Sequence, residues 1–241
     1  MKRYINCICP TFGRAPHYAH LLNESTYWFL RQSYPYKRLI ILNDAPQQTL
    51  RMDYTYPEIT IVNASERYPT LGAKLNALID LCDGDIICPW DDDDISLPHR
   101  LDQAAKKFSD GIEYFNPQRT WFENSAGIHW KHSHGYCHNA SAFKNGAARY
   151  DASPEATGEN DKRIDAILQK AVKAIPLTHP RDWSYIYRWG VSDLHLSAHR
   201  NMQEVYEHVA LKIAPGEFVI SPMKGKDYAS DCATLASTVA G

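Results

Sequence analysis

The sequence predicts an α/β fold in which a mostly parallel β-sheet is flanked by helices and continues into a smaller mixed half. Two observations support this prediction. Apolar strand-like runs alternate with helical patterns over residues 4–108, as they do in parallel sheets. Polar residues follow the ends of these runs, and ligands of such sheets bind outside the carboxyl ends of the strands. We therefore expect a ligand site at one edge of the sheet.

Each element of the first half rests on its own pattern. The predicted strands are short apolar runs that stop at proline or at polar residues, and the predicted helices carry apolar residues at helical spacing. In chain order, the elements are a strand at 4–9, a helix at 16–33, strands at 38–42 and 59–62, a helix at 70–81, a strand at 85–90 and a helix at 97–108.

The second half has a different texture. Residues 111–143 contain short, aromatic-rich strand-like pieces, and a helical pattern follows over 158–174. The small and polar residues at the end of the chain predict a loose tail. The remaining predicted elements are a strand at 182–187 and a helix at 202–210. The chain is accordingly divided into residues 1–110, 111–220 and 221–241.

Composition limits the classes of protein to consider. The 241 residues carry a formal charge of -2, which gives no overall attraction to nucleic acid or to an anionic membrane. No segment approaches the ~20 apolar residues of a membrane-spanning helix. The six cysteines are scattered, several of them in apolar runs, as reduced core cysteines are. We expect a cytoplasmic protein without disulfides or an integral membrane segment.

Four consecutive aspartates, Asp91 to Asp94, directly follow the apolar run at residues 85–90. Carboxylates this close repel one another unless a cation neutralises them, and hard oxygen ligands suit magnesium, manganese or calcium. If the strand continues through them, alternate side chains project to opposite faces. An EF-hand loop is excluded, because Ile95 and Ser96 occupy its fifth and sixth positions. The alternative is a solvated acidic turn that precedes a helix capped by Ser96.

Several short series occur in one order along the chain. They are Pro10-Thr11-Phe12-Gly13-Arg14, Leu42-Asn43-Asp44, Gly72-Ala73-Lys74-Leu75-Asn76, and Asp91-Asp92-Asp93-Asp94 before Pro98. Together they resemble family 2 glycosyltransferases of the GT-A fold. The resemblance covers residues 4–105 well and the remainder loosely. It implies a nucleotide-sugar-binding half at 1–110 and an acceptor-binding, catalytic half at 111–220.

The resemblance implies a nucleotide-sugar donor, with a UDP-sugar as the expected one. Asp44 matches the acid that binds the base, Lys74 stands where a cation faces the diphosphate, and Asp91 matches the acid near the ribose. Arg188 and its neighbour Trp189 are further candidates for contacts with the diphosphate and with a sugar face. The donor-binding residues expected in this way are Pro10, Thr11, Arg14, Asp44, Lys74, Asn76, Asp91, Asp92 and Arg188.

This sequence departs from the family pattern at two positions. Gly13 replaces the usual Asn before Arg14, which eases the approach of the backbone. Asn43 replaces the usual first acid, so recognition of the base rests on Asp44.

The resemblance also implies a divalent metal, Mn²⁺ or Mg²⁺, and a general base. Asp93 matches the metal-coordinating acid, and His195 is the candidate for a histidine that completes the metal shell. An inverting transferase needs a base to accept the proton of the acceptor hydroxyl. Asp161 is the first candidate and Glu159 the second. The alternative is that these acids merely favour the start of a helix.

The acceptor is left open between a glycan, a protein and hydroxymethylated DNA. Basic residues interleaved with aromatics in the second half favour DNA, whereas the net charge does not. A histidine-rich segment is interpreted as a polar acceptor wall, with zinc as the alternative. Its members are His129, His132, His134, Cys137 and His138. The expected activity is that of a hexosyltransferase, and the alternatives are a non-catalytic sugar-binding or nucleotide-binding module and a sugar nucleotidyltransferase.

Overall fold

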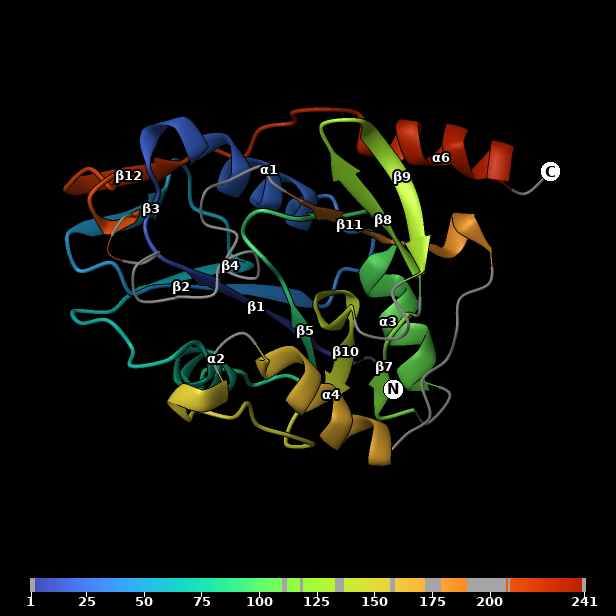
Figure 1. Ribbon diagram of the computed structural model, residues 1–241, viewed down its shortest axis with the longest axis horizontal. Helices are drawn as coiled ribbons and strands as arrows, with labels where there is room; N and C mark the ends of the chain where they lie inside the picture. Colours follow the sequence, from blue (N-terminus) through green and yellow to red (C-terminus); the bar gives the residue numbers. More distant parts are fainter. Residues whose placement is uncertain are drawn as a thin grey trace.

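The computed structural model describes residues 3–109, 112–117, 119–132, 137–156, 159–171, 179–189, 207 and 209–239. Its centre is a six-stranded sheet in the order β4-β2-β1-β5-β10-β7 (Figure 1). The four strands of the first half are parallel, and β10 is antiparallel to both of its neighbours. The strands are β1 (Ile5–Thr11), β2 (Lys37–Asn43), β4 (Ile59–Asn63), β5 (Ile86–Pro89), β7 (Tyr114–Phe115) and β10 (Ala142–Lys144).

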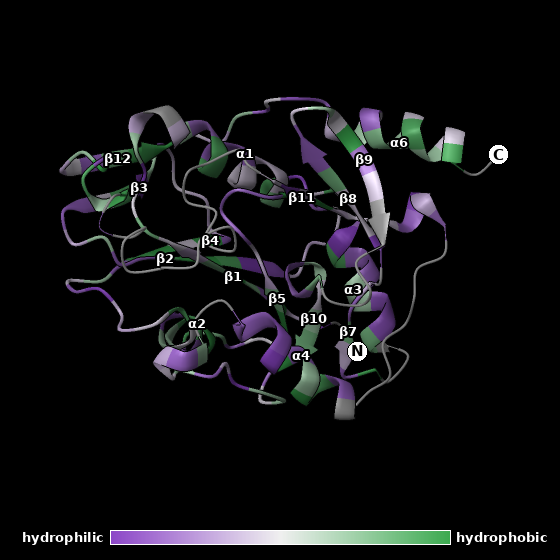
Figure 2. Ribbon diagram, viewed as in Figure 1, coloured by the Kyte–Doolittle hydropathy of each residue, from purple (hydrophilic) through white to green (hydrophobic). Residues whose placement is uncertain are grey.

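Helices cover both faces of this sheet because alternate strand residues point to opposite sides. On one side, Cys7 and Leu39 belong to a core that includes Phe29 and Leu101 from two helices. On the other, Ile8 and Ile40 pack with residues of α2 and α4. Figure 2 shows apolar residues on the central strands and hydrophilic ones along the outer turns. The helices are α1 (Ala19–Leu30), α2 (Leu71–Asp80), α3 (Arg100–Ser109) and α4 (Asn160–Ala171). The predicted α/β class with a mostly parallel sheet is confirmed.

Two smaller sheets flank the central one. A four-stranded sheet has the order β6-β11-β8-β9, and β3 pairs in parallel with β12. Neither β3 nor β12 was predicted, since their pairing joins residues more than 160 positions apart. Four single-turn 3-10 helices complete the described elements. The bounds are β3 (Gln48–Met52), β6 (Ile95–Ser96), β8 (Arg119–Asn124), β9 (Gly127–His132), β11 (Tyr185–Arg188), β12 (Gly216–Ile220), η1 (Pro16–Tyr18), η2 (His138–Ala140), η3 (Pro154–Ala156) and η4 (Pro180–Asp182).

The end of the chain differs from the loose tail expected for residues 221–241. Residues Tyr228–Val239 form helix α6, which packs beside the four-stranded sheet (Figure 1). Tyr228, Cys232 and Ala236 lie four residues apart and are buried. The spacing of this stripe is helical, but the small and polar residues around it hide it from a hydropathy analysis. The Tyr228 hydroxyl also donates a 2.8 Å hydrogen bond to Glu123.

Other expectations about the chain have mixed outcomes. The helix expected at 158–174 is present over Asn160–Ala171, whereas most of the helix expected at 202–210 lies outside the described residues. All six cysteines are free thiols, as expected. In the part of the chain that is described, no helix has the length and apolar character needed to cross a bilayer.

Candidate functional site

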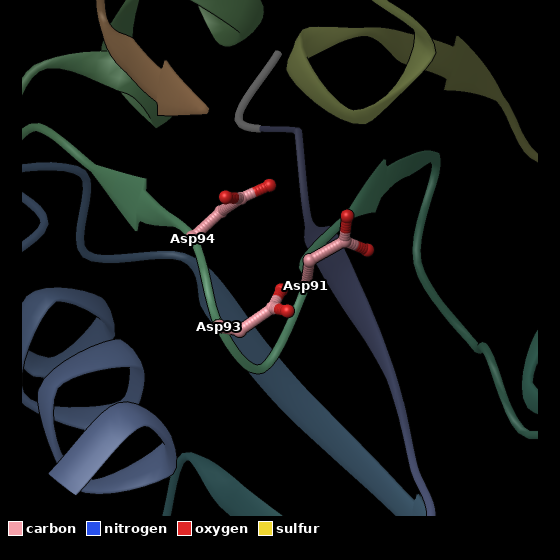
Figure 3. A group of neighbouring side chains, drawn as sticks. All are labelled: Asp91, Asp93 and Asp94. Atoms are coloured by element: carbon pink, nitrogen blue, oxygen red, sulfur yellow. The ribbon is translucent and has the colours of Figure 1, made fainter. Parts of the chain in front are cut away.

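The four aspartates form a bend at the carboxyl end of β5, which we call the acid loop (Asp91–Asp94). Within it, Asp91, Asp93 and Asp94 each direct one carboxylate oxygen into a common region, and these atoms lie within 4.8 Å of one another (Figure 3). The expectation that Asp94 and Asp93 face opposite sides is therefore wrong. The strand ends at Pro89, and the bent backbone beyond it no longer alternates its side chains.

Neighbouring elements hold the acid loop in this shape. The Ser25 hydroxyl on α1 donates to the backbone oxygen of Asp91 at 2.8 Å, and the Asn139 amide donates to its carboxylate. The backbone N–H of Arg188 donates to Asp94 Oδ1 at 2.6 Å, and the Tyr185 hydroxyl donates to Oδ2 of the same residue.

Burial and the crowding of negative charge together determine the electrostatics of the acid loop. Burial, together with the charges of Asp94 and Asp93, raises the pKa of Asp91 well above its ordinary value. Burial and the charge of Asp93 raise the pKa of Asp94 to about 7, against the lowering effect of its hydrogen bonds. A carboxylate with a raised pKa is one whose charge is not compensated by its surroundings. A hard divalent cation with oxygen preference fits this donor set and would compensate it.

Arg14 is held by a partner in the acid loop. It is buried, and its guanidinium forms an ion pair with Asp92. Gln48 fixes the backbone of Arg14 from both sides, with hydrogen bonds of 2.6 Å to its N–H and 3.0 Å to its carbonyl. The structure thus brings together two of the expected donor-binding residues as partners of each other.

Lys74 and Asp44 form a second buried pair. Lys74 Nζ donates to Asp44 Oδ1 at 2.6 Å and to the backbone oxygen of Thr11 at 2.5 Å. The other carboxylate oxygen of Asp44 accepts the N–H of Tyr68 at 3.1 Å. Burial lowers the pKa of Lys74, although the charge of Asp44 opposes this shift. The expected cation and the expected base-binding acid therefore neutralise each other beside the carboxyl end of β1, to which Pro10 and Thr11 belong.

Two other expected donor-binding residues use their polar groups within the protein. The Asn76 amide exchanges two 2.9 Å hydrogen bonds with the backbone of Tyr150, which ties α2 to the segment before α4. Arg188 is buried, pairs with Glu24 on α1 and donates from Nε to the backbone oxygen of Asp93. Through these contacts, Arg188 holds the acid loop in its bent conformation.

Asn43 stands where the family usually has its first acid. Its side chain is fully buried, and both its oxygen and its nitrogen are fully used in hydrogen bonds. Its Oδ1 accepts the N–H groups of Gly13 at 2.8 Å and Ala45 at 3.1 Å. Its Nδ2 donates to the backbone oxygen of Gln48 at 2.7 Å and to Asn63 Oδ1 at 3.1 Å. Gly13 has a φ of 56°, in the left-handed region that favours glycine. Asn43 therefore locks the loops after β1 and β2.

The substitution Asn43→Asp should destabilise the protein by about 1–3 kcal/mol, because a carboxylate oxygen would then face two acceptor oxygens in a buried site. Urea-induced unfolding measures this change. Asn124→Asp is the matched control, since the exposed Asn124 uses only an oxygen, which accepts the N–H of Ala126, and an aspartate retains that oxygen. Equal stability of the two variants would contradict the described role of Asn43.

The two candidate bases at the start of α4 have different surroundings. The side chain of Glu159 is 58% exposed and lies 3.7 Å from Arg163. Asp161 is half-buried, and its pKa is raised by burial although the charge of His138 lowers it. The charge of Asp161 also contributes to the raised pKa of Asp91, which places the two acids within electrostatic reach. This electrostatic effect on Asp91 and the partial burial of Asp161 distinguish it from the exposed Glu159.

A buried polar network supports α4 and was missed by the sequence analysis. Asp165, one turn after Asp161, accepts hydrogen bonds from the Tyr114 hydroxyl at 2.6 Å and pairs with His138 Nδ1 at 2.7 Å. His138 Nε2 lies 2.7 Å from the Tyr150 hydroxyl. Burial lowers the pKa of His138, but Asp165 outweighs it, so the net shift is upward. The i, i+4 spacing of Asp161 and Asp165 was the one available signal.

The histidine-rich segment does not act as one wall in the described structure. His138 is buried in the network above, whereas His129 is exposed on β9. His134 and the side chain of His132 lie outside the described residues, and so does His195, the second expected metal ligand. Among the described side chains, Asp91, Asp93 and Asp94 are the one group of three or more acids, histidines or cysteines placed to hold a metal.

Comparisons with known proteins agree with this geometry. The profile of the family described as Glycosyl transferase family 2 matches residues 7–167, which is more than half of the chain. No curated protein sequence matches the chain.

Two solved structures share the fold of this chain. Because their sequence identities are low, the similarity shows the fold alone. The TarS fragment 1–349 of S. aureus in complex with UDP-GlcNAc has a TM-score of 0.61 and 12% identity, over 87% of this chain and 66% of that fragment. The mannosyltransferase PcManGT of Pyrobaculum calidifontis in complex with GDP-Man and Mn²⁺ has a TM-score of 0.54 and 16% identity, over 100% and 81% of the two chains. This chain thus spans just under two thirds of the TarS fragment. The predicted GT-A fold is confirmed.

Proposed function

The chain belongs to glycosyltransferase family 2, and from this premise we propose that it moves a hexose from a nucleoside diphosphate to an acceptor hydroxyl. The proposed donor is a UDP-sugar, and the proposed metal is Mn²⁺ or Mg²⁺ at the acid loop. The observation that carries the proposal is the convergence of Asp91, Asp93 and Asp94 at the carboxyl end of β5. This is the edge of a parallel sheet at which ligands bind.

The pairing of the cations supports a need for metal. Lys74 and Arg188 were the side chains expected to face the diphosphate, and Arg14 was expected to bind the nucleotide. Each of the three is already paired with a carboxylate. Their positive charge is largely neutralised before a donor arrives. A bound Mn²⁺ or Mg²⁺ would supply the positive charge that stabilises the leaving diphosphate. Asp93 would hold it, with Asp91 and Asp94 beside it.

Asp161 is the proposed general base. The acceptor oxygen attacks the anomeric carbon as the bond from that carbon to the diphosphate breaks. The hydroxyl proton passes to the Asp161 carboxylate, and attack opposite the leaving group inverts the anomeric centre. The raised pKa of Asp161 suits this role, since a carboxylate with a higher pKa is a stronger base. The buried pair of Asp165 and His138 holds α4, and with it Asp161, in place.

Donor hydrolysis tests the proposal without knowledge of the acceptor. UDP-glucose, UDP-galactose, UDP-GlcNAc and GDP-mannose are incubated with the protein and Mn²⁺, and release of the nucleoside diphosphate is measured. Turnover is expected with Mn²⁺, is lost after EDTA and returns when excess Mn²⁺ is added.

The alternatives give different results in the same assay. No turnover, with no thermal stabilisation by UDP, GDP or TDP plus Mn²⁺, would contradict the proposal and leave a module that does not act on these donors. Formation of pyrophosphate from a nucleoside triphosphate and a sugar phosphate would instead identify a nucleotidyltransferase.

A further inference from the structure

A continuous row of aromatic rings crosses the four-stranded sheet. Strand register places Tyr187 on β11 beside Phe122 on β8, and Phe122 beside His129 on β9. The ring centroids of Phe122 lie 5.5 Å from those of Tyr187 and 6.1 Å from those of His129. Trp189 extends the row, at 6.0 Å from Tyr187. We call these four residues, Trp189, Tyr187, Phe122 and His129, the aromatic row.

The aromatic row does not lie on the core face of this sheet. Strand alternation puts Trp121, Glu123 and Ile186 on the opposite face, where they are buried. The rest of the fold covers that face at Trp121 and Glu123, since Trp121 packs on Trp183 and Glu123 binds Tyr228 of α6.

Solvent reaches part of the aromatic row. Phe122 and Tyr187 are half-buried, His129 is exposed, and Trp189 is 47% exposed. A contiguous set of partly exposed aromatic rings is a candidate binding surface.

The aromatic row is continuous with the candidate active site. Tyr185 precedes Tyr187 by two residues on β11, so both side chains point to the same face. The Tyr185 hydroxyl donates to Asp94 in the acid loop. Strand β6, which immediately follows the acid loop, pairs with β11 at Tyr185. Tyr187 of β11 and the adjoining Trp189 therefore form the end of the row nearest the acid loop, and we call it the Tyr187 end.

The chemistry of the row fits a saccharide. A sugar ring has a face of C–H groups with partial positive charge, which complements the negative face of an aromatic ring. His129 Nε2 provides a hydrogen-bonding group for the sugar hydroxyls at the edge of that ring, whereas Nδ1 lies 3.4 Å from the backbone oxygen of Gly127.

The described charges do not favour a polyanion such as DNA. The cations of these strands whose side chains are described belong to the opposite face, where Arg188 pairs with Glu24 and Arg119 lies over the Trp130 ring. Lys226 also pairs there with Glu123. The aromatic row itself contains no lysine or arginine, and nucleic-acid binding requires such cations to neutralise the phosphate groups.

We propose that the aromatic row binds the acceptor and that this acceptor is a saccharide. The sugar to be modified lies at the Tyr187 end, and further sugar units extend toward His129. The inference rests on the proposed function, because only a transferase makes the bound saccharide an acceptor.

A glycan array tests the inference with UDP and Mn²⁺ present. Asp161→Asn serves as the parent protein, so that bound glycans are not altered. The parent is compared with the same protein carrying Trp189→Ala or Trp130→Ala. These two tryptophans are equally exposed, at 47%, but Trp130 lies on the opposite face, so it is the matched control. His129→Ala is a second variant of the row, because His129 is exposed and its removal leaves the core intact.

Binding of at least one class of glycan is expected, with an affinity roughly 3–10-fold weaker after Trp189→Ala or His129→Ala and unchanged after Trp130→Ala. Absence of any glycan binding, or equal loss in the Trp130 control, would overturn the inference. Binding of single-stranded DNA that depends on Trp189 would also overturn it.

Thermal stabilisation by UDP and Mn²⁺, measured on the same parent protein, separates this outcome from failure of the proposed function. Stabilisation without glycan binding contradicts only the saccharide acceptor. Glycan binding without stabilisation contradicts the transferase, and the row is then a saccharide site that is not an acceptor site.

Discussion

Replacing Asp93 by asparagine should reduce Mn²⁺-dependent release of nucleoside diphosphate by ~10²–10³-fold, the cost of losing one electrostatic group that stabilises charge in a transition state. The substitution retains the shape of the side chain and removes one of the three converging negative charges of the acid loop. The affinity for Mn²⁺, measured by isothermal titration calorimetry, should fall in parallel. The effect is large because Arg14, Lys74 and Arg188 are already paired and have little charge to offer in place of the metal.

Asp83→Asn is the matched control for this change. Asp83 is 68% exposed and forms only a surface pair with Arg38 at 3.5 Å, so its loss should leave turnover unchanged. If Asp93→Asn retains full turnover and full Mn²⁺ affinity, the acid loop is not the metal site. Asp92→Asn would be a poor control, since it leaves the buried Arg14 without its partner.

The second large effect is expected for Asp161→Asn, which should lower kcat by ~10²–10⁴-fold, the usual contribution of a positioned general base. Donor hydrolysis is the measurement, because water takes the place of the acceptor hydroxyl and needs the same base. Thermal stabilisation by UDP and Mn²⁺ should persist, since Asp161 is proposed to act on the acceptor and not on the donor. This separation of turnover from binding distinguishes a base from a residue that shapes the donor site.

Glu159→Gln is the matched control, two residues away on the same helix terminus. Its side chain is exposed and close to Arg163, so little change in turnover is expected. The reverse pattern, with turnover lost in Glu159→Gln and retained in Asp161→Asn, would assign the base to Glu159. Full turnover in both variants would place the base elsewhere in the protein.

The first half of the fold was predictable because its signals are local. Residues 39–42 and 86–90 are continuously apolar, as strands buried on both faces must be. The helix after Thr70 begins with a hydrogen bond from Ala73 N–H to the Thr70 hydroxyl, and threonine is a residue type that is favoured at this position. Because strand ends in a parallel sheet share one edge, the position of the acid loop followed from the same patterns.

The features that were not predictable depend on contacts between distant residues. Strand β12 pairs with β3, and Tyr228 reaches Glu123 across 105 positions. The same limit applies within the site, where residue type indicated a cation at Lys74 but not the buried Asp44 beside it. A sequence shows which groups a site contains, whereas the folded structure shows which of their charges remain available.

The contacts of Arg188 with the acid loop have a consequence for how metal binding and folding are linked. Arg188 contacts Asp93 and Asp94, its register partner Glu123 binds Tyr228, and Gly225 lies directly against Glu24, the ion-pair partner of Arg188. The loop and α6 are thus joined by one chain of contacts. An ion that binds more tightly when the loop is braced also stabilises α6. By reciprocity, unfolding of α6 weakens the binding of that ion by the same factor. Helix α6 is in this sense a remote part of the proposed metal site.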